Sequence, residues 1–182
     1  YLPRGVIEQN MDAENGAVIR LALGDDFANK SGADRVALID SWLEANAAPV
    51  LAALAPERRT FIGQDFGRLK DLTVIAVGQD QADTVLRVPL VIELRNVPFD
   101  EQTRILDWLV ERLPRFGSAK LDATGNGLVI AERMQARWGE HRVEAVKLSE
   151  PVYLALMPRL KARLQDRMLA LPRDAEIMGD LL

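Results

Sequence analysis

The amino-acid sequence predicts an α/β protein with a mixed β-sheet, helices on its faces and a helical arm at its N-terminus. The first observation is that three strand-like runs, rich in branched and aromatic residues, follow one another between residues 61 and 94 with only short turns between them. The second is that strand-like runs alternate with helical patterns after residue 98. Because hairpins join antiparallel strands and helical crossovers join parallel ones, the sheet should contain both kinds of pairing.

Length, charge and cysteine content narrow the class of protein. A chain of 182 residues, 48% of them hydrophobic, can bury the core of one domain with an appendage. The net charge of −4 argues against a generally basic surface for nucleic acid. The absence of cysteine excludes disulfides and thiolate metal sites and fits a reducing cytoplasm, which is the location we expect. No apolar run approaches a membrane span, so no membrane partner is expected.

Residues 1–57 are expected to form an arm or linker packed on a main domain of residues 58–182. The pattern before residue 60 gives no strong strand signal. Asp34 is predicted to cap a helix, and Pro49 to open a second short one. Since the chain starts at tyrosine rather than methionine, we expect it to be part of a longer protein.

The predicted strands of the main domain are Phe61 to Phe66, Leu72 to Val77, Thr84 to Leu94, Ser118 to Ala123 and Arg142 to Leu148. Pro89 cannot donate a hydrogen bond, so the third strand should lie at a sheet edge or contain a bulge there. Helices are expected after Pro98, after Gly127 and from about Glu150 to Gln165, the last kinked or split by Pro158. A further short strand is expected at Met168 to Leu171.

This succession of elements predicts a ribonuclease-H-like sheet, with the strands in the order third, second, first, fourth, fifth. The order places the first strand beside the fourth and therefore brings Asp65 and Asp122 together. Adjacent strands lie about 4.8 Å apart, so two such carboxylates can share a metal ion. Glu93 lies two strands from Asp65, at roughly twice this distance, and is therefore predicted to be a surface residue.

Asp65 is a carboxylate inside an otherwise apolar strand, where aspartate is disfavoured and a buried unpaired charge is costly. On the strand alone, the favoured interpretation is a strand-end aspartate that accepts hydrogen bonds from the amides of Gly67 or Arg68. When Asp122 is considered as well, the favoured interpretation of Asp65 is a metal ligand, because two adjacent carboxylates repel each other unless a cation lies between them. With no cysteine and one histidine in the chain, such oxygen ligands favour Mg²⁺ or Mn²⁺. A pair of these ions can clamp the attacking and leaving oxygens of a phosphodiester.

The remaining motifs are interpreted as structural features rather than as functional sites. Thr124-Gly125-Asn126-Gly127 lacks the lysine of a phosphate loop and is expected to let the chain turn sharply from strand to helix. Asp71 is expected to cap the hairpin turn rather than to support a metal ion, and His141 is given no role. The tryptophans are expected to be core residues rather than base-stacking platforms: Trp42, Trp108 and Trp138.

Five basic residues between positions 155 and 173, against the single acidic Asp166, form a strip of local positive charge. A solvated helix face is the commoner origin of such a strip. The alternative is that Lys161, Arg163 and Arg167 contact DNA phosphates without reading the base sequence.

Four segments, GQDFGRLKDLTVIAV, VIELRNVPFDEQ, LDATGNGLVIAERM and LPRDAEIMGDL, together resemble the C-terminal nuclease domain of phage terminase large subunits, in the version found in Mu-like phages and prophages. The similarity covers residues 58–182, and YLPRGVIEQ resembles the segment leading out of that family's ATPase domain. The resemblance implies a ribonuclease-H-like, metal-dependent endonuclease that cuts concatemeric double-stranded DNA during packaging in the bacterial host cytoplasm. It also implies a small terminase subunit and the portal as partners.

The resemblance further implies that Asp65 and Asp122 are the first two catalytic, metal-binding carboxylates of the family. The third comes from a later helix in that family and is expected beyond Leu182, because Asp174, Glu176 and Asp180 lie too early in the pattern. No Walker loop is present either. We therefore expect a piece of an enzyme that is weakly active or inactive on its own.

Two other interpretations are kept. One is a DNA- or protein-binding module with a ribonuclease-H-like fold, in which Asp65 is structural. The other is a sugar-kinase-like or other member of the same fold superfamily, which is disfavoured because the sequence has no nucleotide-phosphate loop. Saturable binding of Mg²⁺ or Mn²⁺ at Asp65 and Asp122 would distinguish the nuclease from the binding module.

Overall fold

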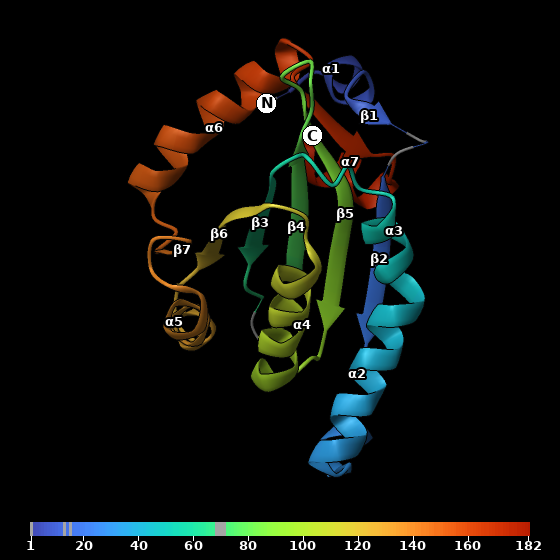
Figure 1. Ribbon diagram of the computed structural model, residues 1–182. Coiled ribbons are helices and arrows are strands. Elements are labelled where there is room, and N and C mark those ends of the chain that lie inside the picture. The colour runs from blue at the N-terminus through green and yellow to red at the C-terminus, as the bar shows by residue number, and fades with distance from the viewer. Residues whose placement is uncertain (1, 13, 15, 68–71) are drawn as a thin grey trace.

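The computed structural model describes residues 2–12, 14, 16–67 and 72–182, and these residues form an eight-stranded mixed sheet with helices on both faces (Figure 1). Five strands belong to the predicted main domain: β3 (Thr60–Asp65), β4 (Thr73–Asp80), β5 (Leu86–Arg95), β6 (Phe116–Asp122) and β7 (Val143–Val146). Their order is β5-β4-β3-β6-β7, with antiparallel pairing of β3 with β4 and of β4 with β5, and parallel pairing of β6 with β3 and with β7. The predicted strand order and mixed pairing are confirmed.

One face of the sheet is covered by α2 (Gly32–Asn46), α3 (Ala48–Ala52), α4 (Phe99–Arg112) and α5 (Gly127–Trp138). Alternate residues of the central strands point into this layer and are fully buried there, among them Ile75, Ile92 and Leu121. The 3₁₀ segment η1 (Asp25–Asn29) leads into α2, whose cap is Ser31 and not the predicted Asp34. The Ser31 hydroxyl accepts a hydrogen bond from the Asp34 amide at 3.1 Å, because Asp34 already lies within the first helical turn.

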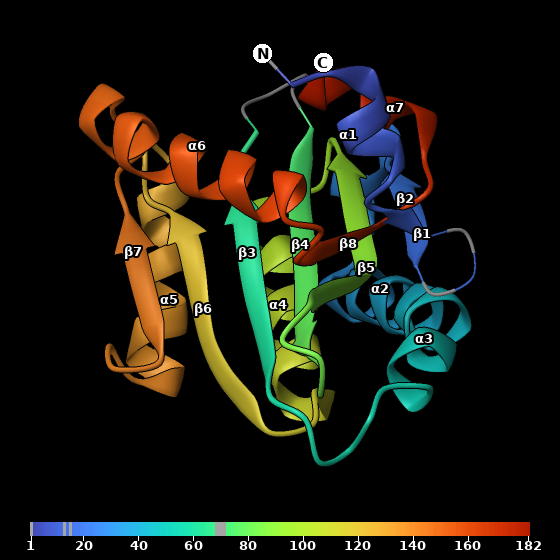
Figure 2. The same ribbon diagram turned by 90° about the horizontal axis from the view of Figure 1, so that it is seen from above.

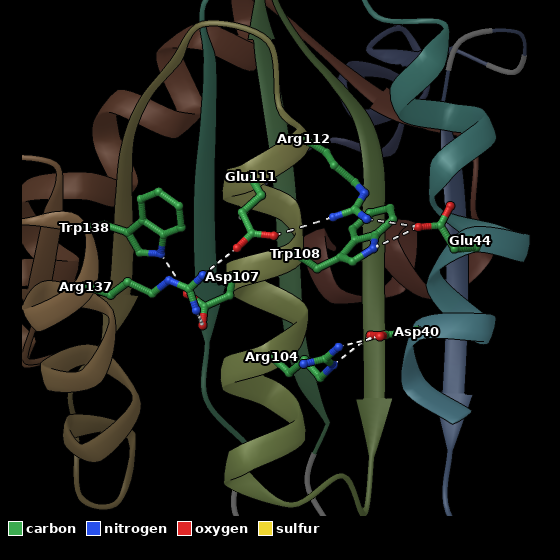
Figure 3. A network of polar contacts seen from close by, with 9 residues as sticks. All are labelled: Asp40, Glu44, Arg104, Asp107, Trp108, Glu111, Arg112, Arg137 and Trp138. Carbon is green, nitrogen blue, oxygen red and sulfur yellow. Dashed lines mark hydrogen bonds and ion pairs between the residues drawn. The ribbon is translucent and has the colours of Figure 1, made fainter. Parts of the chain in front are cut away.

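Ion pairs and tryptophans join the helices of this layer (Figure 3). Arg104 of α4 pairs with Asp40 of α2, and the Trp108 indole of α4 donates to Glu44 of α2 at 3.2 Å. On the other side of α4, the Trp138 indole of α5 donates to an Asp107 oxygen at 2.7 Å. Trp108 is 5% exposed, and Trp42 and Trp138 pack against the same core. The prediction that the tryptophans are core residues is confirmed.

The opposite face carries α1 (Arg4–Glu8), α6 (Glu150–Gln165) and α7 (Ala175–Leu181), and Figure 2 shows α6 crossing this face with α4 and α5 behind the sheet. A second apolar cluster holds these helices, and its buried members are Leu2, Ile7, Met11, Val88, Val91, Leu164 and Leu169. The α6 helix is continuous through Pro158, so it is not split, and a kink there remains a prediction. None of the described helices is long and apolar enough to cross a membrane.

The N-terminal segment contributes strands that the sequence pattern did not predict. β2 (Ala17–Ala22) pairs in parallel with β5, and β1 (Met11–Asp12) pairs in parallel with β8 (Leu169–Pro172). Only Leu21 of β2 is buried, which explains why the segment lacks the alternation that marks a half-buried strand. The short strand expected near Met168 to Leu171 is confirmed as β8.

Pro89 lies where the pairing of β5 changes. On one side of β5, its partner is β8 at Leu86 and Arg87 and β2 from Leu90 onward. On the other side, the register with β4 shifts between Val77 and Gln79. A residue without an N–H fits such a position, because no ladder hydrogen bond is required of it. The bulge that the sequence predicted is confirmed, whereas the edge position is not, since β5 has neighbours on both sides.

Candidate metal centre

Asp65 and Asp122 are the last residues of neighbouring parallel strands. Asp65 ends β3 and Asp122 ends β6, and the register pairs Gln64 with Leu121, one residue earlier on each strand. Strands paired in this way lie about 4.8 Å apart, and equivalent positions share one face of the sheet. The backbones of the two predicted site residues are therefore adjacent, while their role as metal ligands stays a prediction.

Both carboxylates belong to the face of the sheet that α6 crosses. Gln64 and Leu121 are buried on the α4 and α5 side, and the following residue of each strand points the other way because side chains alternate. Across the sheet, Asp65 is paired with Val74, which packs with the apolar cluster beneath α1, α6 and α7. In Figure 2, α6 passes in front of the ends of β3 and β6.

The two aspartates differ in exposure, and the charge of Asp122 acts on Asp65. Asp122 is only 6% exposed, whereas Asp65 is exposed. Partial desolvation by the surrounding protein and the charge of Asp122 raise the pKa of Asp65 above its usual value. A divalent cation between the two carboxylates would favour their ionised forms. The pair thus has the electrostatic character of a cation-binding site.

The hydrogen bonds around the strand ends bear on the structural interpretation of Asp65. The Gly67 amide donates to the Thr73 hydroxyl at 3.2 Å and not to Asp65, so that part of the interpretation is wrong. Arg68, the other predicted donor, and Asp71, the predicted turn cap, lie outside the described residues.

The loop after β6 holds Asp122 in a tight turn. One Asp122 carboxylate oxygen accepts a hydrogen bond from the Thr124 amide at 2.8 Å, and the Thr124 hydroxyl accepts one from the Leu148 amide at 3.1 Å. Gly125 has a φ of 58°, in the left-handed region that favours glycine. A Cβ on Gly127 would lie 2.3 Å from the Asp122 carbonyl oxygen. The prediction that these glycines allow a sharp turn from strand to helix beside Asp122 is confirmed.

The oxygen atoms at this site suit a hard cation, but they come from two carboxylates, without a third ligand side chain among the described residues. Within residues 2–12, 14, 16–67 and 72–182, no three His, Asp or Glu side chains are grouped so that they could hold a metal ion. The carboxylates of Asp174 and Glu176 form ion pairs with the Arg20 guanidinium, at 3.0 and 3.4 Å. That Asp65 and Asp122 hold Mg²⁺ or Mn²⁺ stays a prediction, which rests on oxygen atoms of the kind that suit these ions.

Glu93 is not the surface residue that its distance from Asp65 predicted. It is 6% exposed, and one of its carboxylate oxygens lies 2.6 Å from Nε of Arg20. The sheet register joins Arg20 to Glu93, Glu93 to Val74 and Val74 to Asp65, so all four lie in one row on one face. Sequence reasoning missed Arg20 because it did not predict β2.

The basic strip lies in and after the last turns of α6. Lys161, Arg163 and Arg167 are all exposed, as either a solvated helix face or a phosphate-binding strip would require. Arg167 follows the helix with a φ of 58°, where the chain turns toward β8. Contact of these three side chains with DNA stays a prediction.

This mixed sheet with helices on both faces matches the ribonuclease-H-like fold of large-terminase nuclease domains. The nuclease domain of the large terminase from thermophilic phage G20c, solved with bound magnesium, superposes with a TM-score of 0.58 at 25% sequence identity. The match covers 70% of this chain and 65% of that one. The same nuclease has been solved with bound cobalt (TM-score 0.59, 24% identity) and with bound zinc (TM-score 0.57, 25% identity).

The chain is a homologue of gp28 of Mu-like phages. It is 36% identical over 180 residues to the Mu-like prophage FluMu protein gp28 of Haemophilus influenzae, covering 99% of this chain and 35% of that protein. It is 35% identical over 183 residues to the probable terminase large subunit gp28 of Escherichia phage Mu, covering 100% of this chain and 33% of that protein. The chain thus spans about a third of the length of these relatives. No family profile matches it.

Proposed function

We propose that the chain is the metal-dependent endonuclease domain of a phage DNA-packaging terminase and that it cleaves concatemeric double-stranded DNA by two-metal phosphodiester hydrolysis. The observation that carries this proposal is the position of Asp65 and Asp122 at adjacent strand ends, on the fold of a terminase nuclease that binds magnesium. On this proposal both aspartates are catalytic ligands. The host cytoplasm would be the place of action, and the small terminase subunit and the portal would be partners of the complete protein.

Mg²⁺ or Mn²⁺ is the cofactor that fits these residues. When bound, such ions polarise a phosphodiester and stabilise the attacking and leaving oxygens. The chain's own contribution is to fix the ligands: the tight turn after β6 orients Asp122 through the Thr124 amide. The raised pKa of Asp65 means that a proton competes with the metal for this carboxylate, so metal binding should weaken as the pH falls.

The experiment is a calorimetric titration of the 182-residue protein with MnCl₂, alone and with Asp65→Asn or Asp122→Asn. We expect saturable binding that either substitution weakens by at least about tenfold, because each removes one of two charged ligands. Asp25→Asn, which changes an exposed carboxylate in η1, is the matched control and should leave binding unchanged. Equal binding by all four proteins would overturn the metal site.

Cleavage is tested on supercoiled plasmid DNA with Mn²⁺. Since two carboxylates supply part of the ligation that two ions need, the 182-residue protein should nick weakly or not at all. Any nicking should be lost in Asp65→Asn and retained in Asp25→Asn. Nicking that persists in Asp65→Asn would contradict the proposed role of this residue.

The second candidate function is a DNA- or protein-binding module without catalysis. The observation in its favour is that, among the described residues, no third carboxylate joins Asp65 and Asp122. Such a module should show no saturable change on titration with Mn²⁺ at any concentration that leaves the protein folded.

A further inference from the structure

We propose that the uncovered half of the sheet, formed by β3, β6 and β7 below α6, is the surface on which a DNA backbone lies, with Lys120 as the phosphate contact next to the carboxylates. The inference deepens the proposed nuclease function and rests on it. In Figure 2 these strands have α4 and α5 behind them, and in the described part of the chain no helix other than α6 crosses in front of them.

Lys120 lies on the same face as the candidate metal centre. It precedes Asp122 by two residues on β6, so both side chains point to one side of the sheet, roughly 6.6–7 Å apart along the strand. Its neighbours in register are Gly63 on β3 and Glu144 on β7. A phosphodiester bound at the strand ends would therefore have an ammonium within reach of the next phosphate.

The Lys120 side chain is available for such a contact. It is 63% exposed, and its ammonium lies 2.6 Å from a carboxylate oxygen of Glu144, which is 59% exposed. An exposed pair of this kind adds little to stability, because both ions remain hydrated. Glu144 does, however, hold the ammonium over the face of the sheet. A phosphate can then replace or join the carboxylate as its partner.

Gly63 marks a place where a second molecule can come close to the sheet. It lies in the middle of β3, between Lys120 and Ala76 in register, and a Cβ added there would meet no atom within 4 Å. Glycine weakens a strand interior and often marks a site of close approach. No neighbour within the described residues requires the glycine. We assign its small size to the DNA backbone that lies over it.

A second basic residue continues the surface away from the metal centre. Arg59 precedes β3, and its guanidinium carbon lies 5.9 Å from the ring centroid of Phe61, which is two residues from Gly63 on the same face. The distance from Arg59 to Asp65 corresponds to roughly 20 Å of strand. At 3.4 Å per nucleotide along a duplex strand, this length accommodates about six nucleotides.

The test is binding of a short fluorescein-labelled DNA duplex to the 182-residue protein, measured by anisotropy with Ca²⁺ present between about 50 and 200 mM KCl. Lys120→Ala should lower the affinity about threefold to tenfold and reduce the slope of log K against log[KCl] by about 0.9. Glu144→Gln keeps the lysine and should keep the slope. Lys30→Ala, an exposed lysine between η1 and α2, is the matched control and should bind as the unchanged protein does.

Gly63→Val separates binding from folding. Valine favours strands, so this variant should melt at the same or a higher temperature than the unchanged protein, yet bind the duplex more weakly because the valine side chain occupies the surface where the DNA lies.

If the unchanged protein binds DNA and both Lys120→Ala and Gly63→Val bind it equally well, the inferred surface is wrong and the nuclease proposal stands. If the unchanged protein does not bind the duplex, both the inferred surface and the nuclease proposal fail. If Lys120→Ala reduces binding but Mn²⁺ does not bind, the DNA surface stands without the nuclease.

Discussion

The guanidinium of Arg20 on β2 lies 2.6 Å from the buried carboxylate of Glu93 on β5 and 3.0 Å from the carboxylate of Asp174, which caps α7. Burial opposes ionisation of Asp174, but the hydrogen bonds from Arg20 and from the amides of Ile177 and Glu176 prevail and lower its pKa. One side chain thus ties the N-terminal strand, the sheet and the C-terminal helix together.

Removal of this guanidinium should destabilise the fold. Arg20→Met leaves the buried Glu93 charge without its partner, and we expect a loss of about 1–3 kcal/mol in the free energy of unfolding, less than for a fully buried pair because Arg20 is 44% exposed. The control is Arg4→Met, which breaks the exposed pair with Glu8 and should cost less than about 0.5 kcal/mol. Urea unfolding measures both. Equal losses would show that the Arg20 pair contributes no more than a surface contact.

The strand order could be predicted because each central strand carries its own local signals. Branched and aromatic residues form β3 to β5, turns separate them, and helical patterns separate β6 and β7. The adjacency of Asp65 and Asp122 follows from that order alone. The bulge at Pro89 could be predicted because proline has no N–H to offer a ladder.

What could not be predicted depends on contacts between distant parts of the chain. The burial of Glu93 could not be predicted, because its partner Arg20 lies 73 residues earlier, on a strand that buries only Leu21. No local pattern marks such a strand. Lys120 had a detectable signal, since it stands two residues before Asp122 and strand side chains alternate, but an exposed lysine on a strand has many ordinary explanations.

Gln64 and Gln79 are buried glutamines that should respond oppositely to the same substitution. Neither polar side-chain atom of Gln64 has a hydrogen-bond partner among the described residues, whereas Gln79 accepts from the Ala55 amide at 3.2 Å and donates to its carbonyl at 2.8 Å. Gln64→Met should leave the free energy of unfolding unchanged or raise it by up to about 1 kcal/mol. Gln79→Met should lower it by about 1–3 kcal/mol, because the Ala55 groups lose their partners. A comparable loss in both variants, measured by urea unfolding, would show that Gln64 is bound by something unseen, such as a buried water.

Gly127 should tolerate no side chain. The Cβ of Gly127→Ala would lie 2.3 Å from the Asp122 carbonyl oxygen, so the turn must move, at a cost of about 1–3 kcal/mol. The control is Gly179→Ala in α7, where a Cβ meets nothing within 4 Å and alanine should stabilise by about 0.5–1 kcal/mol. Thermal melts compare the two. If Gly127→Ala melts with the unchanged protein, the close contact does not constrain the Asp122 turn.

Asp65→Asn should stabilise the metal-free protein at neutral pH. Partial desolvation and Asp122 raise the pKa of Asp65, so the folded protein holds this proton more tightly than the unfolded chain does. Stability is therefore lost as the pH rises above the usual aspartate pKa of about 3.9, and Asn avoids that loss. Because Asp65 is exposed, we expect a gain in melting temperature of at most about 2–4 °C, which vanishes below about pH 3.5.

Asp40→Asn is the control of opposite sign. The hydrogen bond from Arg104 lowers the pKa of Asp40, so this variant should be less stable than the unchanged protein at neutral pH, and the loss should fade as the pH falls. Melting curves across this pH range decide the matter, and an Asp65→Asn that is destabilised at pH 7 without metal would assign Asp65 a structural role.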